Sequence, residues 1–404
     1  MAELMQRNAG RSPGYWALTD RRWPALLLLA GLSAYVLSTF VAEDVRQVRN
    51  IFDAFVVLPV MLVLIRNPGL AMSVLRFRIF ILFLALIALF LLPVFWSPVE
   101  DFGELIEGRL RHSLRVIFFI SAFLIIPDVR RHFSSTIPVV FALGLLAALA
   151  QYIPNIIEDP SARRVVGGGL LAENPNITAF ALSLGALFCW YLFMEERDSK
   201  FLKASFFILF AVTLISSYWT MGRASILALM MAISLYTAMS IFPSSSQRIV
   251  WATFSGLLFF ALVLYSLVHF IDLSLLSGRD VIWRGFLDLS FCQFLFGVGF
   301  AEGNRIELES FSRSFPAHST YIDIIYRAGL LGLVAFLGFI IILLRLLVGD
   351  SSPVVRLYIA VLLYFLVFNV FEGTFPVRNP VPRFFLLWLP LGVLMSLIWH
   401  GRRV

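Results

Sequence analysis

Residues 317–347 read AHSTYIDIIYRAGLLGLVAFLGFIIILLRLL, and this stretch passes from a polar segment into a long apolar run. The apolar part, residues 319–347, is long enough for a helix to cross a hydrocarbon core of roughly 30 Å. His318 stands at the boundary, directly before the expected helix. The stretch therefore predicts a membrane-spanning helix that carries a histidine at its beginning.

The rest of the chain has the same apolar character. Hydrophobic residues make up 60% of the 404 positions, and the apolar runs have helix length and no strand-like alternation. We expect an all-α polytopic membrane protein, with residues 1–404 forming a single integral membrane domain of about twelve transmembrane helices. The expected spans are 23–42, 48–65, 79–95, 108–127, 135–154, 177–194, 204–220, 224–242, 249–270, 319–347, 357–371 and 384–400.

An even number of spans places both termini on one side of the membrane. Four arginines lie between residues 7 and 22, and Arg402 and Arg403 lie at the other end, so both termini are expected in the cytoplasm. Nearly half of the 32 lysines and arginines nevertheless fall on the opposite, outer face. An anionic ligand on that face explains the excess, and pairing with outer-face acids is the alternative.

The longest polar segment, residues 271–317, is expected on the outer face. Within it, SGRDVIWRGFLDL (277–289) predicts a short interfacial helix that carries Arg279 and Arg284. Arginine suits this place because its planar guanidinium recognises phosphate and carboxylate groups.

The two arginines of this segment differ in their acidic neighbours. Arg284 precedes Asp288 by four residues, so a salt bridge along the helix is the alternative to a role in ligand binding. Arg279 has only the adjacent Asp280, which points elsewhere on a helix. Arg279 is therefore the better candidate for an anion ligand.

His318 has the features expected of a general base. Pro316 restricts the approach of the chain to the helix, and Tyr321 follows His318 on the same helical face. The positive end of the helix dipole favours a neutral imidazole with a nitrogen free to take a proton. His112 and His269 also fall near the outer surface, where a structural role is the simpler interpretation.

Further cations are expected on the same face. Arg223 lies in SSYWTMGRASIL (216–227), where two spans almost touch at the outer surface. Arg109 lies in an amphipathic segment, 96–115, and the loop 154–176 carries two more arginines. These supporting candidates are Arg109, Arg163 and Arg164.

Four residues within the apolar span 319–347 have structural interpretations. Asp323 and Arg327 are four residues apart in span 319–347, which predicts a neutralising pair within the membrane. Gly329 and Gly332 are small residues that allow close packing.

Metal and disulfide motifs are not apparent. The sequence contains no HExxH, CxxC or Asp-x-Asp pattern, and its two cysteines do not predict a disulfide. No metal or other cofactor is expected, so arginine would have to stabilise the charge on any leaving group.

Several motifs together resemble the O-antigen ligase/polymerase family of bacterial envelope proteins. They are GRDVIW (278–283), FGVGFAEG (296–303) and AHSTYIDIIYRAGLLGL (317–333). Two patterns are similar to the ligase branch, and the resemblance covers most of the chain. One is Arg-x3-Leu, matched by Arg223 and Leu227, and the other is His-Ser-x9-Gly-x2-Gly, matched by His318, Ser319, Gly329 and Gly332.

The resemblance implies an inverting, metal-independent glycosyltransferase with a GT-C-like fold in the bacterial inner membrane. Such a ligase moves O-antigen from undecaprenyl pyrophosphate to a sugar hydroxyl of lipid A–core, at the periplasmic face. The resemblance makes His318 the catalytic histidine. It also assigns pyrophosphate binding to Arg223 and one loop arginine, Arg279 or Arg284. Arg109, Arg163, Arg164 and Tyr321 would assist. Membrane lipids are the remaining expected partners, and nucleic acid is not one.

Other functions are open to the same sequence. An O-antigen polymerase or a protein O-oligosaccharyltransferase would have the same fold. A transporter of an anionic solute is the alternative from a different class, and it requires charged residues along a path through the bilayer. Only Asp323, Arg327 and Arg345 fall within the later apolar spans, which makes a transporter the weaker interpretation.

Overall fold

The computed structural model describes residues 22–98, 101–158, 175–220, 222–242, 279–300, 306–307, 314–347, 349–380 and 382–401. Helices dominate this part of the chain, and nine of its helical segments are long and apolar enough to cross a membrane. Its strands are β1 (Ile306–Glu307) and β2 (Ser314–Phe315), which pair antiparallel. The protein is an all-α polytopic membrane protein, as predicted.

The first half of the chain forms helical spans with short interruptions. Its elements are α2 (Arg22–Val41), α3 (Val45–Phe52), η1 (Asp53–Val57), α4 (Leu58–Arg66), α5 (Pro68–Leu75), α6 (Arg78–Leu91), η2 (Leu92–Trp96), α7 (Phe102–Ile125), α8 (Val129–Arg131), η3 (His132–Thr136) and α9 (Ile137–Glu158).

The second half continues in the same way, with two short helices in the outer loop. Its helices are α10 (Pro175–Glu195), α11 (Lys200–Trp219), α12 (Arg223–Ile241), α14 (Arg279–Leu287), α15 (Phe291–Phe296), α16 (Thr320–Leu347), α17 (Pro353–Phe371) and α18 (Pro382–Gly401). Each predicted span coincides with a long helical segment, except that the predicted span 249–270 lies outside the described residues.

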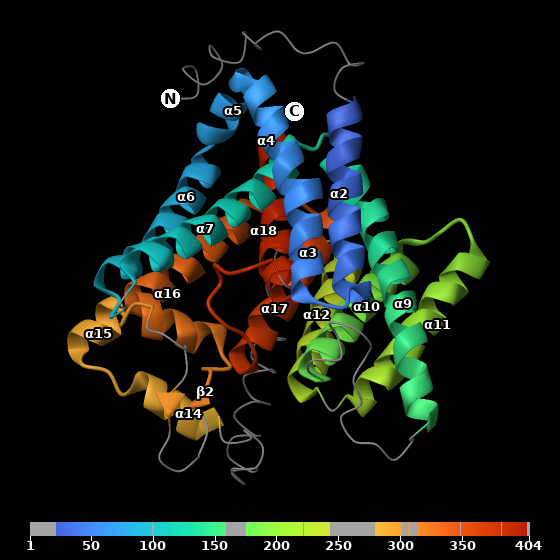
Figure 1. The fold of residues 1–404 in the computed structure, drawn as a ribbon. Helices are drawn as coiled ribbons and strands as arrows, with labels where there is room; N and C mark the ends of the chain where they lie inside the picture. Colours follow the sequence, from blue (N-terminus) through green and yellow to red (C-terminus); the bar gives the residue numbers. More distant parts are fainter. Residues whose placement is uncertain are drawn as a thin grey trace.

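The beginning of α2 and the end of α18 lie at the same end of the helical bundle, at the top of Figure 1. The loop elements α14 and β2 lie at the opposite end. This arrangement agrees with an even number of crossings. The compartment that each end faces stays a prediction.

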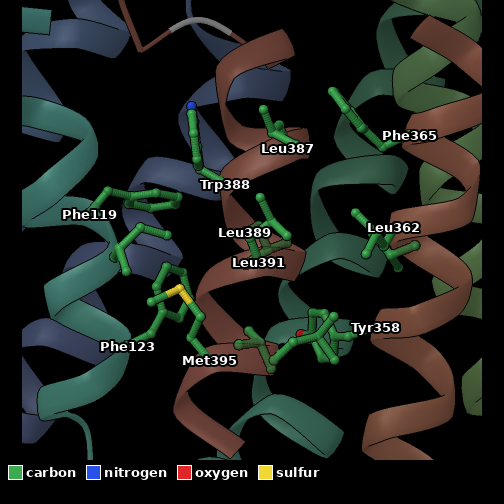
Figure 2. Close-up of a cluster of buried hydrophobic side chains, with 14 of the residues drawn as sticks. Phe119, Phe123, Tyr358, Leu362, Phe365, Leu387, Trp388, Leu389, Leu391 and Met395 are labelled. Carbon is green, nitrogen blue, oxygen red and sulfur yellow. The ribbon is translucent and has the colours of Figure 1, made fainter. Parts of the chain in front are cut away.

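The core lies around α18, which contacts both α7 and α17. Phe119 and Phe123 of α7 face Trp388 and Met395 of α18, and Tyr358 lies on the α17 side (Figure 2). All five side chains are fully buried. Aromatic and aliphatic side chains of this size pack as densely as an organic crystal. They fix the position of α17, whose end carries the site described below.

A break in α16 separates its first two turns from the rest of the helix. Gly329 has φ +69° and ψ −177°, a conformation that non-glycine residues rarely adopt. The carbonyl oxygens of Tyr326 and Arg327, in the preceding turn, accept hydrogen bonds from Val298 N (2.7 Å) and Gly299 N (3.2 Å). The segment after α15 therefore satisfies backbone groups of α16 beside the break.

Gly329 also permits a close approach to α15. A Cβ atom at this position would lie 2.0 Å from the carbonyl oxygen of Leu295. The prediction that the paired glycines allow close packing is confirmed for Gly329, and the neighbour is α15 of the outer loop.

Candidate active site

The carboxylate of Glu372 joins three elements that are far apart in the sequence. Glu372 caps the end of α17 and is only 1% exposed. Its Oε1 accepts hydrogen bonds from Asn176 Nδ2 at 2.6 Å and from Arg279 Nη2 at 2.5 Å. Its Oε2 lies 3.5 Å from His318 Nδ1. One buried carboxylate thus holds a cation and an imidazole in the same place.

The helical connectivity explains why these elements meet. The helix α16 begins beside His318 and runs away from the site, and α17 returns to it at Glu372. The helix α10 starts at this same end with Asn176, and α12 packs against both α10 and α17. Helices joined by short connections alternate in direction, so α12 also begins at the end of the bundle that carries the site.

The backbone of His318 is held in an unusual conformation. Its φ of +51° places it in the left-handed region, which costs on the order of 1–3 kcal/mol for a residue with a Cβ. Both neighbours are fixed: the indole of Trp283 donates to Ala317 O at 2.9 Å, and Ser319 Oγ donates to Asn369 O at 3.4 Å. Contacts with α14 and α17 therefore set the direction of the imidazole.

The residue after Glu372 must be glycine. Gly373 has φ +147°, and a Cβ atom there would lie 2.3 Å from both Thr320 Oγ1 and Asn369 Oδ1. A side chain at this position would push apart the two residues that fix the start of α16. The Glu372-Gly373 pair is thus a structural unit that brings the carboxylate to His318.

The expectation that Arg279 has only the adjacent Asp280 as an acidic neighbour is wrong. Its partner is Glu372, 93 residues later in the chain. The Nε of Arg279 is buried and has no hydrogen-bond partner among the described residues. Arg279 therefore keeps donors for an anion even though one of its nitrogens is paired.

Sequence reasoning missed Glu372, although a simple pattern could have found it. Glu372 is the only acidic residue between position 351 and the C-terminus. It ends an apolar span and is followed by glycine. An isolated carboxylate at such a place is costly unless a cation or hydrogen-bond donors satisfy it.

Arg284 is not brought to Glu372. It lies five residues after Arg279 in α14, which places it about 140° around the helix axis. The Arg284 side chain is exposed. Within the described residues 279–300, it makes no salt bridge with Asp288. The alternative of a local salt bridge between Arg284 and Asp288 is therefore not observed. Of the two loop arginines, Arg279 is the one that lies beside His318.

Arg223 is the first residue of α12 and is exposed at the end of the bundle that carries the site. Its side chain makes no salt bridge within the described ranges. The structure therefore places Arg223 at the same end of the bundle as Glu372, without a contact to Glu372. Arg163 and Arg164 lie outside the described residues.

The other supporting candidates occupy different places. The guanidinium of Arg109 lies 3.8 Å from the centre of the Phe300 ring. The Tyr321 hydroxyl donates to Leu366 O at 2.7 Å, so it fixes α16 to α17. Neither contact involves Glu372 or His318.

The predicted pair within α16 is confirmed. Arg327 Nε donates to Asp323 Oδ1 at 2.6 Å, and both side chains are buried. The second oxygen of Asp323 accepts the backbone N–H of Phe375 at 2.6 Å. The pair thus also anchors the segment that follows Glu372.

The arrangement around Glu372 can bind an anion and accept a proton. Arginine holds phosphate-like oxygens, and an imidazole whose Nδ1 faces a carboxylate presents Nε2 as a base. Across the described ranges, no three His, Cys, Asp or Glu side chains lie together as metal ligands. The expectation of metal-independent chemistry stays a prediction.

These features define a multi-pass helical membrane protein with a buried, shared carboxylate at one end of its bundle. No family model matches the chain. The chain is similar to a protein of Pseudomonas aeruginosa named O-antigen ligase, with 24% identity over 412 aligned residues. The alignment covers 95% of this chain and 94% of the relative.

Proposed function

We propose that the protein is an O-antigen ligase. It transfers a glycan from undecaprenyl pyrophosphate to a sugar hydroxyl of lipid A–core. The observation that carries the proposal is the carboxylate of Glu372, which touches both Arg279 and His318. The similarity to the Pseudomonas aeruginosa protein over nearly the full length supports it.

His318 acts as the general base in this proposal. The carboxylate of Glu372, whose Oε2 lies 3.5 Å from Nδ1, favours the tautomer with the proton on Nδ1 and so keeps Nε2 unprotonated and directed at the acceptor. The acceptor hydroxyl gives its proton to Nε2 while its oxygen attacks the anomeric carbon of the donor. The new glycosidic bond forms on the face opposite to the leaving group, so the configuration inverts.

Arg279 stabilises the leaving group. The bond between the anomeric carbon and the pyrophosphate oxygen breaks, and its electron pair goes to that oxygen. Arg279 is placed to share this charge because one nitrogen is fixed by Glu372 while its buried Nε keeps a free N–H. Arg223, at the start of α12, and Arg284 are proposed to contact the outer part of the donor.

A transfer assay with purified components tests the proposal. Wild-type protein in detergent should move glycan from a polyprenyl pyrophosphate donor to lipid A–core. His318→Gln should lower the rate about 10²- to 10⁴-fold because the general base is lost. His132→Gln is the matched control, since His132 lies in η3 at the opposite end of the bundle. Near-normal transfer by His318→Gln would rule out this base.

The choice of acceptor distinguishes the related activities. A ligase glycosylates lipid A–core, a polymerase lengthens the glycan on its polyprenyl carrier, and a protein O-oligosaccharyltransferase modifies a polypeptide. Only product on lipid A–core, with no carrier-linked polymer, supports the proposal. Anionic solute uptake by reconstituted vesicles without glycan transfer would instead favour the transporter.

The proposed orientation puts the site in the periplasm and both termini in the cytoplasm of an inner-membrane protein. Cys292 offers a direct test because it is exposed on α15, whereas Cys189 is buried in α10. A membrane-impermeant maleimide should label Cys292 in intact spheroplasts, and Cys292→Ser should abolish the labelling. Labelling of Cys292 only after lysis would indicate the opposite orientation in the membrane.

A further inference from the structure

The carboxylate of Glu372 is held by two donors that differ in charge. Arg279 of α14, a cation, donates to Oε1 from Nη2 at 2.5 Å. Asn176 of α10, which is neutral, donates to the same oxygen from Nδ2 at 2.6 Å. The other oxygen, Oε2, lies 3.5 Å from His318 Nδ1. The two donors on Oε1 thus set the direction in which Oε2 points.

Arg279 has a second partner in the proposed function, the leaving pyrophosphate. The pyrophosphate and the carboxylate of Glu372 are both anions, so they attract the same guanidinium and repel each other. The Arg279 side chain is 19% exposed, and that of Glu372 only 2%. Arg279 is thus the one of the two that can turn to a ligand, and its contact with Glu372 should weaken when the donor binds.

The hydrogen bond from Asn176 depends far less on a bound anion. Its amide carries no net charge, so the pyrophosphate attracts it much less strongly than it attracts the guanidinium. A hydrogen bond to an ionised carboxylate is also stronger than one between two neutral groups. Asn176 is therefore suited to hold Glu372 in place while Arg279 contacts the ligand.

The beginning of α10 is fixed to the end of α17. Phe180, one turn after Asn176, packs against Phe368 of α17 with the ring centroids 4.9 Å apart. Phe368 lies one turn before Glu372, whose backbone N–H donates to Phe368 O at 3.0 Å. One turn earlier, the hydroxyl of Tyr364 donates to Phe180 O at 3.3 Å. Asn176 and Glu372 therefore each lie one turn from the same buried aromatic contact.

The turn before α12 also rests on the beginning of α10. A Cβ atom on Gly222 would lie 2.2 Å from the Cβ atom of Ala179. Ala179 is fully buried and lies about one turn after Asn176. Gly222 directly precedes Arg223, the first residue of α12. Asn176 thus belongs to a helix end that is enclosed by α12 as well as by α17.

We propose that Asn176 is a positioning residue of the transfer reaction, whose amide keeps the carboxylate of Glu372 directed at His318. It does so while Arg279 binds the leaving pyrophosphate. This role rests on the proposed function, because it concerns the same site. Asn176 acts through Glu372 and does not itself contact the reacting atoms.

Steady-state kinetics of glycan transfer test this role, with a polyprenyl pyrophosphate donor and lipid A–core as acceptor. Asn176→Leu keeps the approximate volume of the side chain but removes the amide, and it should lower kcat about 10-fold. The donor KM should stay within about 3-fold of the wild type, because Arg279 and Arg223 are unchanged. Asn176→Gln retains an amide donor and should recover part of the lost rate.

A double-mutant cycle shows whether Asn176 acts through Glu372. If it does, adding Asn176→Leu to Glu372→Gln should change kcat by less than about 2-fold, because the charge that Asn176 holds is already gone. Two independent effects would instead multiply, and the double variant would be about 10-fold slower than Glu372→Gln. Such a multiplicative loss would overturn the positioning role.

Asn67→Leu is the matched control. Asn67 lies between α4 and α5 at the opposite end of the bundle, and its Nδ2 donates to Val63 O at 2.9 Å. This variant loses an amide hydrogen bond far from the site, so its kcat should stay within about 2-fold of the wild type. If Asn176→Leu does not fold, Asn176→Ala replaces it in both experiments, with the same expected loss of kcat.

The outcomes distinguish this role from the proposed function. If the wild-type protein transfers no glycan, the proposed function is wrong and the role of Asn176 falls with it. If the wild type transfers glycan and Asn176→Leu has an unchanged kcat, only the role of Asn176 is wrong. A raised donor KM with an unchanged kcat would assign Asn176 to donor binding and would equally overturn the positioning role.

Discussion

Asp323–Arg327 and Glu372–Arg279 are both buried arginine–carboxylate pairs, and they are built in opposite ways. The first lies within one helix, four residues apart, and its second carboxylate oxygen accepts a backbone N–H. The second joins residues 93 apart and shares its carboxylate with Asn176 and His318. The Asp323–Arg327 pair is closed, because its carboxylate is fully used, whereas the Glu372–Arg279 pair is open, because its carboxylate also contacts Asn176 and His318.

This difference between the two pairs indicates that Asp323–Arg327 serves stability and that Glu372–Arg279 serves function. The carboxylate of Asp323 is satisfied by Arg327 and the backbone N–H of Phe375, so the closed pair leaves no carboxylate oxygen for a substrate. The pair around Glu372 leaves the Arg279 Nε without a partner and holds an imidazole beside it. The two pairs should therefore respond differently to the same type of substitution.

Breaking the closed pair, Asp323–Arg327, should have the largest effect of the substitutions considered. The effect should be a loss of protein stability. Arg327→Met leaves the buried carboxylate of Asp323 without its cation, which costs about 3–5 kcal/mol. The free energy of unfolding in detergent should fall by that amount. The double variant Asp323→Asn/Arg327→Met should recover most of it, because no charge remains buried. An equally unstable double variant would contradict this explanation.

Breaking the open pair, Glu372–Arg279, should affect the rate of glycan transfer instead of protein stability. Arg279→Gln removes a cation beside the leaving group and should lower the transfer rate about 10²- to 10³-fold. Arg284→Gln is the matched control on the same helix, and its rate should stay within about 3-fold, in line with a peripheral contact to the donor. If Arg284→Gln lost as much activity as Arg279→Gln, the assignment of the loop arginine would be wrong.

Removing only the charge of Glu372 should have a smaller effect. Glu372→Gln keeps the shape of the side chain but no longer orients an imidazolium, so transfer should fall about 10- to 100-fold. The pH–rate profile should also shift, which a purely structural role would not cause. Glu195→Gln is the control, because Glu195 accepts from Tyr236 and Arg356 at the opposite end of the bundle. An unshifted pH profile would contradict the orienting role.

The smallest predicted effect concerns the break in α16. Gly329→Ala places a Cβ in the left-handed region and against Leu295 O, which should destabilise the protein by about 1–3 kcal/mol. Gly338→Ala, in the same helix with open space around its Cα, should be neutral or slightly stabilising. The apparent melting temperatures of the two variants, compared with the wild type, give the test.

The membrane spans could be predicted from sequence because their cause is local. A run of about 20 apolar residues must form a helix in lipid, since every backbone group has to be paired within the segment. The Asp323–Arg327 pair was predictable for the same reason, because four residues make one helical turn. The break at Gly329 was not, since its partner is a segment of the outer loop.

The site could be predicted only in part, because its contacts are not local. The sequence pointed to His318 and Arg279 by their residue types and positions. It did not point to Glu372, since nothing in the spacing of a single chain says that residues 279, 318 and 372 meet. A helix-length apolar run predicts that a span exists but not which other spans it contacts.

The break in α16 imposes an order on the assembly of the protein in its membrane. The carbonyl oxygens of Tyr326 and Arg327 take their hydrogen bonds from Val298 and Gly299, which precede α16 in the chain. Each such group left unpaired in hydrocarbon would cost several kcal/mol. These two carbonyl groups are paired only when the segment that contains Val298 docks against α16, and this segment precedes α16 in the chain. Biogenesis of this helix thus depends on a loop synthesised before it.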